Sequence, residues 1–146
     1  MRKYLIGLGI LAVAVIGWMT LRPIPQQPVA ENTAAGAPEK GAPIVQVKLT
    51  ELSGEAVIGE RVFNAKCAAC HGENAAGQEG VAPPLIHKIY EPSHHGDQAF
   101  YMAAQNGVRA HHWPFGSMPP VEGVTRADVK AVVTYIRTLQ RENGIY

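Results

Sequence analysis

Hydrophobic residues are unevenly distributed along the chain, and the longest uninterrupted apolar run lies near its start. Residues 4–21 form eighteen consecutive positions without a charge, preceded by Arg2 and Lys3 and followed by Arg22. A helix of this length spans roughly 27 Å, close to the ~30 Å hydrocarbon core of a bilayer. Residues 1–22 are therefore predicted to form a transmembrane signal anchor, with a cleaved secretory signal as the alternative. The basic N-terminus predicts that everything after this helix is exported.

Polar and turn-forming residues replace the apolar run over residues 23–48. This stretch is rich in Pro, Ala, Gln, Gly and Glu, and five prolines are spread along it. Such a composition cannot bury enough apolar surface to offset the entropy of ordering the backbone. The segment is predicted to be a disordered linker, which leaves residues 49–146 as the folded domain.

Two of the helices predicted in this domain begin at polar capping residues. Ser53 is the predicted N-cap of a helix over residues 54–66, where Gly59 shares one face with apolar neighbours at three- and four-residue steps. Glycine inside a helix costs about 1 kcal/mol relative to alanine, so its presence favours close backbone packing. Asp97 is the predicted cap of a second helix, which extends over residues 97–105.

The last helix has the clearest pattern. Thr125 is its predicted cap, and Asp128 follows three residues later, as in a capping box. Its apolar residues form a single stripe: Val129, Val132, Val133, Ile136 and Leu139. No segment of the domain alternates as a strand, and long Gly- and Pro-rich stretches separate the helices. The domain is therefore predicted to be all-α and to need something besides its own side chains to pack around.

Composition and charge exclude several classes of function. The chain carries 13 Lys and Arg, 12 Asp and Glu and 2 Cys, and its formal net charge is +1. This balance gives no bulk basicity for binding nucleic acid, and two cysteines are too few for a disulfide scaffold. From Glu51 onward there are eight basic and ten acidic residues, a difference of −2, so composition predicts no basic docking face. A domain this small would gain stability from a covalent cross-link or a bound metal.

The most informative feature is the pentapeptide Cys67-Ala68-Ala69-Cys70-His71. CxxCH is the attachment motif of c-type haem. Two thiols three positions apart on one helical turn can each form a thioether with a vinyl group on the same edge of a porphyrin. His71 then falls under the iron as the proximal ligand. The motif predicts one haem c, covalently bound through Cys67 and Cys70.

Three other interpretations of the two cysteines remain open at this point. A thiol-disulfide oxidoreductase also uses CxxC, although its motif follows a strand in a βαβ pattern that this sequence lacks. A zinc site could use both thiols and His71, but it needs a fourth ligand. A disulfide between Cys67 and Cys70 would close only a short loop and would stabilise the fold little.

The sequence around this motif resembles the class I monohaem c-type cytochromes of bacteria. The resemblance rests on four short segments in the family's order: residues 59–72, 82–85, 117–119 and 132–136. They are similar to the family's first helix with its haem motif, the proline segment after it, the distal-ligand loop and the last helix. The resemblance implies a cytochrome c fold, in which three to five short helices surround one covalently bound haem.

The resemblance also implies roles for individual residues. Met118 would be the sixth ligand of the iron, and a thioether opposite an imidazole raises the reduction potential. The carbonyl of Pro84 would accept a hydrogen bond from the second ring nitrogen of His71. The first and last helices would cross at Gly59 and Tyr135. The walls of the haem pocket would come from Phe63, Leu85, Trp113 and Tyr135.

The remaining candidate ligands are expected to have structural or solvent-exposed positions. Met102 lies within the second predicted helix and is expected to fill the core. The other histidines are His87, His94, His95, His111 and His112. Adjacent residues on an extended chain point to opposite sides, so each pair is a poor chelator by itself and is expected to be solvated. His111 and His112 are the more interesting pair because they precede Met118 in the same loop.

These observations predict a non-enzymatic electron carrier with His/Met-ligated iron. The carrier is expected to be tethered to the cytoplasmic membrane by a single span, with its cytochrome domain facing the periplasm. Its expected partners are membrane-bound or periplasmic redox proteins, and no nucleic acid. The alternatives are a cytochrome c subunit of a larger membrane dehydrogenase or oxidase, or a ligand-sensing haem protein in which Met118 is labile.

Overall fold

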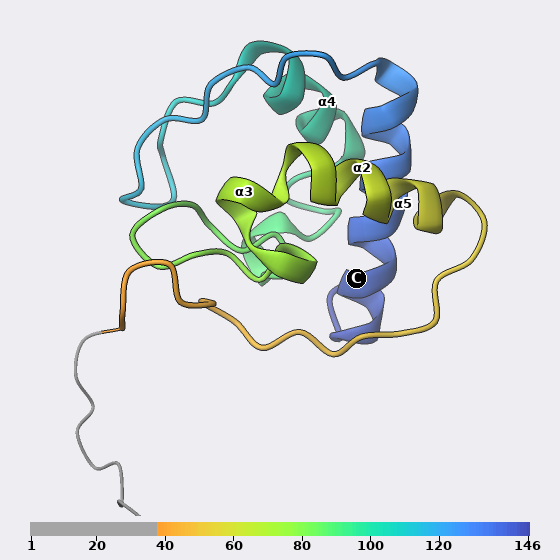
Figure 1. Ribbon diagram of the computed structural model, residues 1–146, viewed down its shortest axis with the longest axis horizontal. Coiled ribbons are helices and arrows are strands. Elements are labelled where there is room, and N and C mark those ends of the chain that lie inside the picture. The colour runs from red at the N-terminus through yellow and green to blue at the C-terminus, as the bar shows by residue number, and fades with distance from the viewer. Residues whose placement is uncertain (1–37) are drawn as a thin grey trace, which may run out of the picture. The chain divides into compact units, whose positions relative to one another are not determined.

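The computed structural model describes residues 38–146, and the ordered elements there are helical. The α-helices are α2 (Glu55–Lys66), α3 (Ala68–His71), α4 (Asp97–Asn106) and α5 (Arg126–Glu142), with 3-10 turns at Glu73–Ala75 and Lys88–Tyr90 (Figure 1). Over this range β-structure is limited to two isolated bridges, Gln78 to Ala82 and Val108 to Met118. The all-α prediction therefore holds for the described part of the chain.

The predicted membrane anchor, residues 1–22, and the first part of the predicted linker lie outside the described residues. From residue 38 onward, no helix has both the length and the apolar character needed to cross a bilayer.

The end of the predicted linker lies against the folded domain. The backbone N–H of Gly41 donates to the carbonyl of Glu79 at 2.8 Å, and that of Val45 donates to Ala76 at 3.1 Å. Lys48 N–H donates to Oδ1 of Asn143 at 2.8 Å. Residues 41–48 are therefore ordered on the domain, because their backbone groups have hydrogen-bond partners there. Composition alone could not reveal these partners.

Helices α2 and α5 cross (Figure 1), as the resemblance implied for Gly59 and Tyr135. A Cβ atom at Gly59 would lie 1.9 Å from the carbonyl oxygen of Ala131 and 2.9 Å from Cβ of Tyr135. One helical turn later, the rings of Phe63 and Tyr135 pack with their centroids 5.6 Å apart. Phe63 and Tyr135 are both almost fully buried, so this crossing forms the centre of the core.

The three predicted caps have different outcomes. The Thr125–Asp128 capping box is confirmed, because Asp128 N–H donates to Oγ1 of Thr125 at 3.1 Å and Thr125 N–H donates to Oδ2 of Asp128 at 2.8 Å. The prediction of Ser53 as a cap is wrong, since Gly54 occupies that position with φ at 55°. The prediction of Asp97 is also wrong, because Gly96 is the cap and the Asp97 carboxylate binds a side chain of α5 instead.

Candidate haem-binding site

A large apolar cavity of ≈ 800 Å³ lies between the haem motif, α4, α5 and the loop after α4. This volume is in the range of cofactor pockets. Seven residues predicted for the site line it together, although they come from segments far apart in the sequence: Phe63, Cys67, Cys70, His71, Leu85, Trp113 and Met118.

His71 is the last residue of α3, and its imidazole is fixed by one hydrogen bond. Nδ1 lies 2.9 Å from the carbonyl oxygen of Pro83. A carbonyl can only accept, so Nδ1 carries the hydrogen and Nε2 keeps its lone pair for a metal. Burial lowers the pKa of His71, an effect that the Pro83 carbonyl partly offsets. The neutral imidazole that iron requires is therefore the favoured form.

The predicted acceptor for His71 was the carbonyl of Pro84, and this prediction is wrong by one residue. Pro84 is fully buried and packs against Gly77, where a Cβ atom would lie 2.4 Å from the Pro84 nitrogen. The N–H of the next residue, Leu85, donates a hydrogen bond to the carbonyl of Ala75 at 2.8 Å. These contacts turn the segment so that the carbonyl of Pro83 faces the imidazole.

The two cysteines are held at the cavity by a side chain that sequence analysis missed. Nε2 of Gln78 donates to carbonyls within the motif, those of Ala69 at 2.9 Å and Cys70 at 3.2 Å. Burial raises the pKa of Cys67 to about 11, and the neighbouring Cys70 adds to the rise. Redox-active CxxC motifs have a lowered thiol pKa, so this environment disfavours the thiol-disulfide interpretation.

Met118 is positioned by a short antiparallel bridge to the end of α4. Its N–H and carbonyl both bond Val108, each at 2.9 Å. The preceding Gly107 has φ at 74°, and a Cβ atom there would lie 2.5 Å from the Met118 carbonyl oxygen. A side chain at residue 107 would therefore displace the loop that brings Met118 to the cavity.

Known proteins share this chain's pattern over the same region. The family model described as Cytochrome c matches residues 56–140, which is more than half of the chain. The chain belongs to the cytochrome c family. It therefore carries a covalently attached haem c with iron, and Cys67 and Cys70 have the spacing that attachment requires. The function of a cytochrome c domain is electron transfer.

Three curated relatives support this assignment over parts of their length. The chain is 34% identical over 87 residues to cbb3-type cytochrome c oxidase subunits FixP from Bradyrhizobium sp. (strain ORS 278) and Bradyrhizobium diazoefficiens. Each match covers 58% of this chain but only 28% of the FixP subunit. A cytochrome c2 of Pararhodospirillum photometricum is 48% identical over 34 residues, which is 23% of this chain and 30% of that protein.

Two residues have different positions from those that the sequence predicted. Met102 was predicted to fill the core, but its side chain lines the haem cavity and 48% of its surface is exposed. Tyr135 was predicted to be a pocket wall, but it lies behind Phe63 in the crossing of α2 and α5 and does not line the cavity. Its hydroxyl lies 3.4 Å from Oδ1 of Asn74.

Trp113 offers a polar contact that fits a haem. Its Nε1 is buried and has no hydrogen-bond partner among the described residues. Burial raises the pKa of the neighbouring Tyr90, and the Trp113 indole partly lowers it. The two side chains nevertheless make no hydrogen bond of normal geometry. A buried N–H without an acceptor is costly, and the carboxylate of a haem propionate would be a suitable acceptor.

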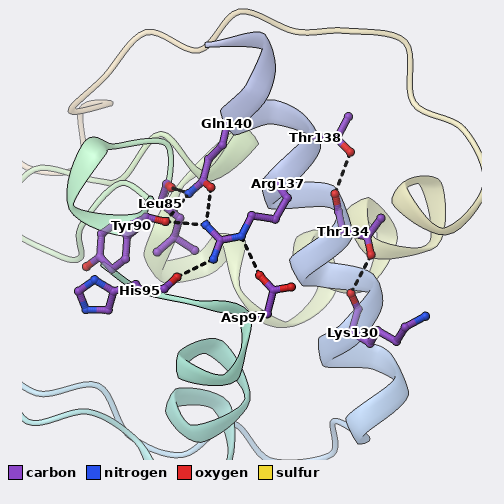
Figure 2. Close-up of polar contacts among 9 residues, drawn as sticks. All are labelled: Leu85, Tyr90, His95, Asp97, Lys130, Thr134, Arg137, Thr138 and Gln140. Carbon is purple, nitrogen blue, oxygen red and sulfur yellow. Dashed lines mark hydrogen bonds and ion pairs between the residues drawn. The ribbon is translucent and has the colours of Figure 1, made fainter. Parts of the chain in front are cut away.

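Arg137 and Gln140 of α5 hold the segment that runs from the cavity wall to α4 (Figure 2). Both are buried. Their acceptors are the carboxylate of Asp97 at 2.9 Å and the backbone carbonyls of Leu85 at 2.8 Å, Tyr90 at 2.6 Å and His95 at 2.5 Å. The sequence carries only a weak signal for this network: two polar residues spaced by three, directly beside the apolar stripe of the last helix.

The five remaining histidines are less uniformly solvated than predicted. His94, His111 and His112 are exposed, as expected, while His87 and His95 are partly buried. His87 packs edge-on against Trp113, with the ring centroids 5.2 Å apart. The two adjacent pairs, each expected to be a poor chelator by itself, come together in space.

Proposed function

We propose that this protein is a membrane-tethered one-electron carrier in which His71 and Met118 are the axial ligands of the haem iron. The observation that carries this proposal is the common cavity of Cys67, Cys70, His71 and Met118. A bound haem c supplies one-electron redox chemistry at its iron. A Met thioether opposite an imidazole stabilises the ferrous state and gives a high reduction potential.

The chain's own residues prepare the site for that role. Pro83 holds the His71 imidazole with Nε2 directed away from the hydrogen bond, and the Val108 bridge fixes the backbone of Met118. Two protein ligands on the iron leave no position for a substrate, so the site favours electron transfer over bond chemistry. The apolar lining excludes water and thereby limits reorganisation when the charge on the iron changes.

The tether and its orientation follow from residues 1–22. Their apolar run and the preceding basic residues support a single span with the cytochrome domain on the periplasmic side. Membrane-bound or periplasmic redox proteins are the corresponding partners.

A second candidate is a subunit of a membrane oxidase. The relatives named cbb3-type cytochrome c oxidase subunit FixP favour it, although the match covers less than a third of those proteins. Mild detergent extraction followed by purification separates the two candidates. A free carrier is recovered alone, whereas a subunit is recovered in stable complex with other oxidase chains.

The direct test of axial ligation is the absorption spectrum of the purified holoprotein. His/Met ligation predicts a weak near-infrared sulfur-to-iron charge-transfer band in the ferric state and no carbon monoxide binding in the ferrous state. Absence of the band together with rapid carbon monoxide binding would contradict the role of Met118 and favour a sensing function.

A further inference from the structure

Two histidine pairs that are distant in the sequence meet at the surface. His94 and His95 precede α4, and His111 and His112 lie in the loop that follows it. The ring centroid of His112 lies 5.2 Å from that of His94, 5.2 Å from that of His95 and 4.2 Å from that of His111. Each pair is a poor chelator by itself, but the fold supplies the opposing pair.

Three of these imidazoles have the arrangement of a metal site. One ligand nitrogen from each of His94, His95 and His112 lies within 4.8 Å of the other two. Tetrahedral zinc with Zn–N bonds of 2.0–2.1 Å separates its nitrogens by about 3.3 Å. His94 and His112 are exposed, so small rotations of their rings can close the remaining distance.

His95 is already oriented as a metal ligand would be. Its Nδ1 lies 2.6 Å from the carbonyl oxygen of Ile89, so Nδ1 donates and Nε2 is left as the ligand atom. Its own carbonyl accepts from Arg137, which fixes the backbone of this residue (Figure 2). A ligating histidine ordinarily has such a second hydrogen bond, because it sets the tautomer and holds the ring.

The surroundings of His112 are also suitable. Partial desolvation and the neighbouring His111, His95 and His94 lower the pKa of His112. The neutral form of His112 is therefore favoured, and the neutral form of an imidazole is the one that binds a metal ion.

We propose that His94, His95 and His112 together bind one divalent transition-metal ion of the Zn²⁺ type, with water completing its coordination. Imidazole nitrogen is a preferred ligand for such ions, and three protein ligands leave one open position. His95 and His112 also line the haem cavity, so the ion would lie at its rim. It would cross-link the segment before α4 to the loop that carries Met118.

The test is a calorimetric titration of Zn²⁺ into the complete holoprotein, produced without an affinity tag and treated with a chelator beforehand. Wild-type protein is expected to bind one equivalent. Loss of even a supporting residue typically costs 10–100-fold in metal affinity. His94→Ala and His112→Ala are therefore each expected to weaken binding about tenfold or more.

His87→Asn is the matched control, since it removes a histidine outside the cluster. Asparagine can still accept from the N–H of Ile89, which His87 Nδ1 does at 3.2 Å. This variant is expected to bind Zn²⁺ like wild type, and an unchanged haem spectrum verifies the fold of all three variants. Absence of binding in wild type overturns the proposal. Affinity unaffected by His94→Ala and His112→Ala, or equally weakened by His87→Asn, also overturns it.

Discussion

At the residue scale, a few hydrogen bonds determine which atoms face the haem. The Pro83 carbonyl selects the tautomer of His71, and the paired bonds of Val108 set the position of Met118. Neither of these two proposed ligands is positioned by its own side chain alone. Each depends on a backbone partner in another segment, which makes its role testable by exchanging the ligand and leaving the partner in place.

Met118→Ala is expected to abolish the near-infrared charge-transfer band of the ferric protein and to let the ferrous protein bind carbon monoxide. Met102→Ala is the matched control, because Met102 is the other methionine that lines the cavity. His112→Ala should also leave both properties unchanged. If Met102→Ala removes the band instead, the ligand assignment is wrong although the haem assignment remains.

Arg137→Ala is expected to lower the free energy of unfolding by about 2–4 kcal/mol, because it removes the donor to the His95 carbonyl and to the buried Oε1 of Gln140. Asp97→Asn should cost less than about 1 kcal/mol, since the Asp97 side chain is 63% exposed and remains solvated without its ion pair. Chemical denaturation measures both. Arg141→Ala, an exposed arginine on the same helix, should have little effect.

At the element scale, the crossing of α2 and α5 provides the rigid frame for the cavity. Phe63 of α2 and Ile136 of α5 belong to both the core and the cavity lining. Local sequence predicted the close packing at Gly59 and the capping box of α5, since both are signals within one or two turns, whereas the crossing of these two helices was implied only by the resemblance to the cytochromes c. The segments between the helices were predicted less well, because their positions depend on contacts from distant side chains such as Gln78 and Gln140.

Gly59→Ala tests the crossing. The new methyl group would lie 1.9 Å from the Ala131 carbonyl oxygen, so the helices must separate. Overpacking of this kind typically costs 1–3 kcal/mol, and we expect about 3 kcal/mol in thermal or chemical unfolding because the obstacle is backbone. Gly96→Ala is the control: φ is ordinary there and the nearest atom is 3.6 Å away. Equal losses in both variants would contradict the close approach.

The capping box of α5 predicts a pH-dependent contribution to stability. Hydrogen bonds from the Thr125 hydroxyl and backbone N–H lower the pKa of Asp128 from 3.8. A depressed carboxyl pKa stabilises the fold above the unfolded-state value, and that contribution disappears as pH falls through the folded-state value. Wild type should therefore exceed Asp128→Asn in melting temperature at neutral pH, and the difference should shrink below pH 3.8. A difference independent of pH would exclude the charge as its source.

At the scale of the whole molecule, the haem explains why such a small domain has so much irregular backbone. The helices and the loops between them leave a cavity of ≈ 800 Å³, and the group attached at Cys67 and Cys70 completes the core. CxxCH made the cofactor predictable because covalent attachment requires a fixed local spacing. The position of Met102 was predicted wrongly, because apolar neighbours in the sequence do not distinguish a protein core from a cofactor pocket.

The ordered body also extends further toward the N-terminus than composition indicated, and truncation tests both this boundary and the predicted anchor. Full-length chain is expected to stay with membranes through salt washing and to leave with detergent, because residues 1–22 supply the apolar span. A chain beginning at residue 38 should be released without detergent and keep the native haem spectrum.

A chain beginning at residue 49 loses the bonds from Gly41, Val45 and Lys48 to the domain. At roughly 1 kcal/mol for each hydrogen bond, it should unfold about 2–4 kcal/mol more easily than the chain from residue 38. Equal stability of the two truncated chains would show that residues 41–48 contribute nothing, and release of the full-length chain by salt would remove the support for a membrane span.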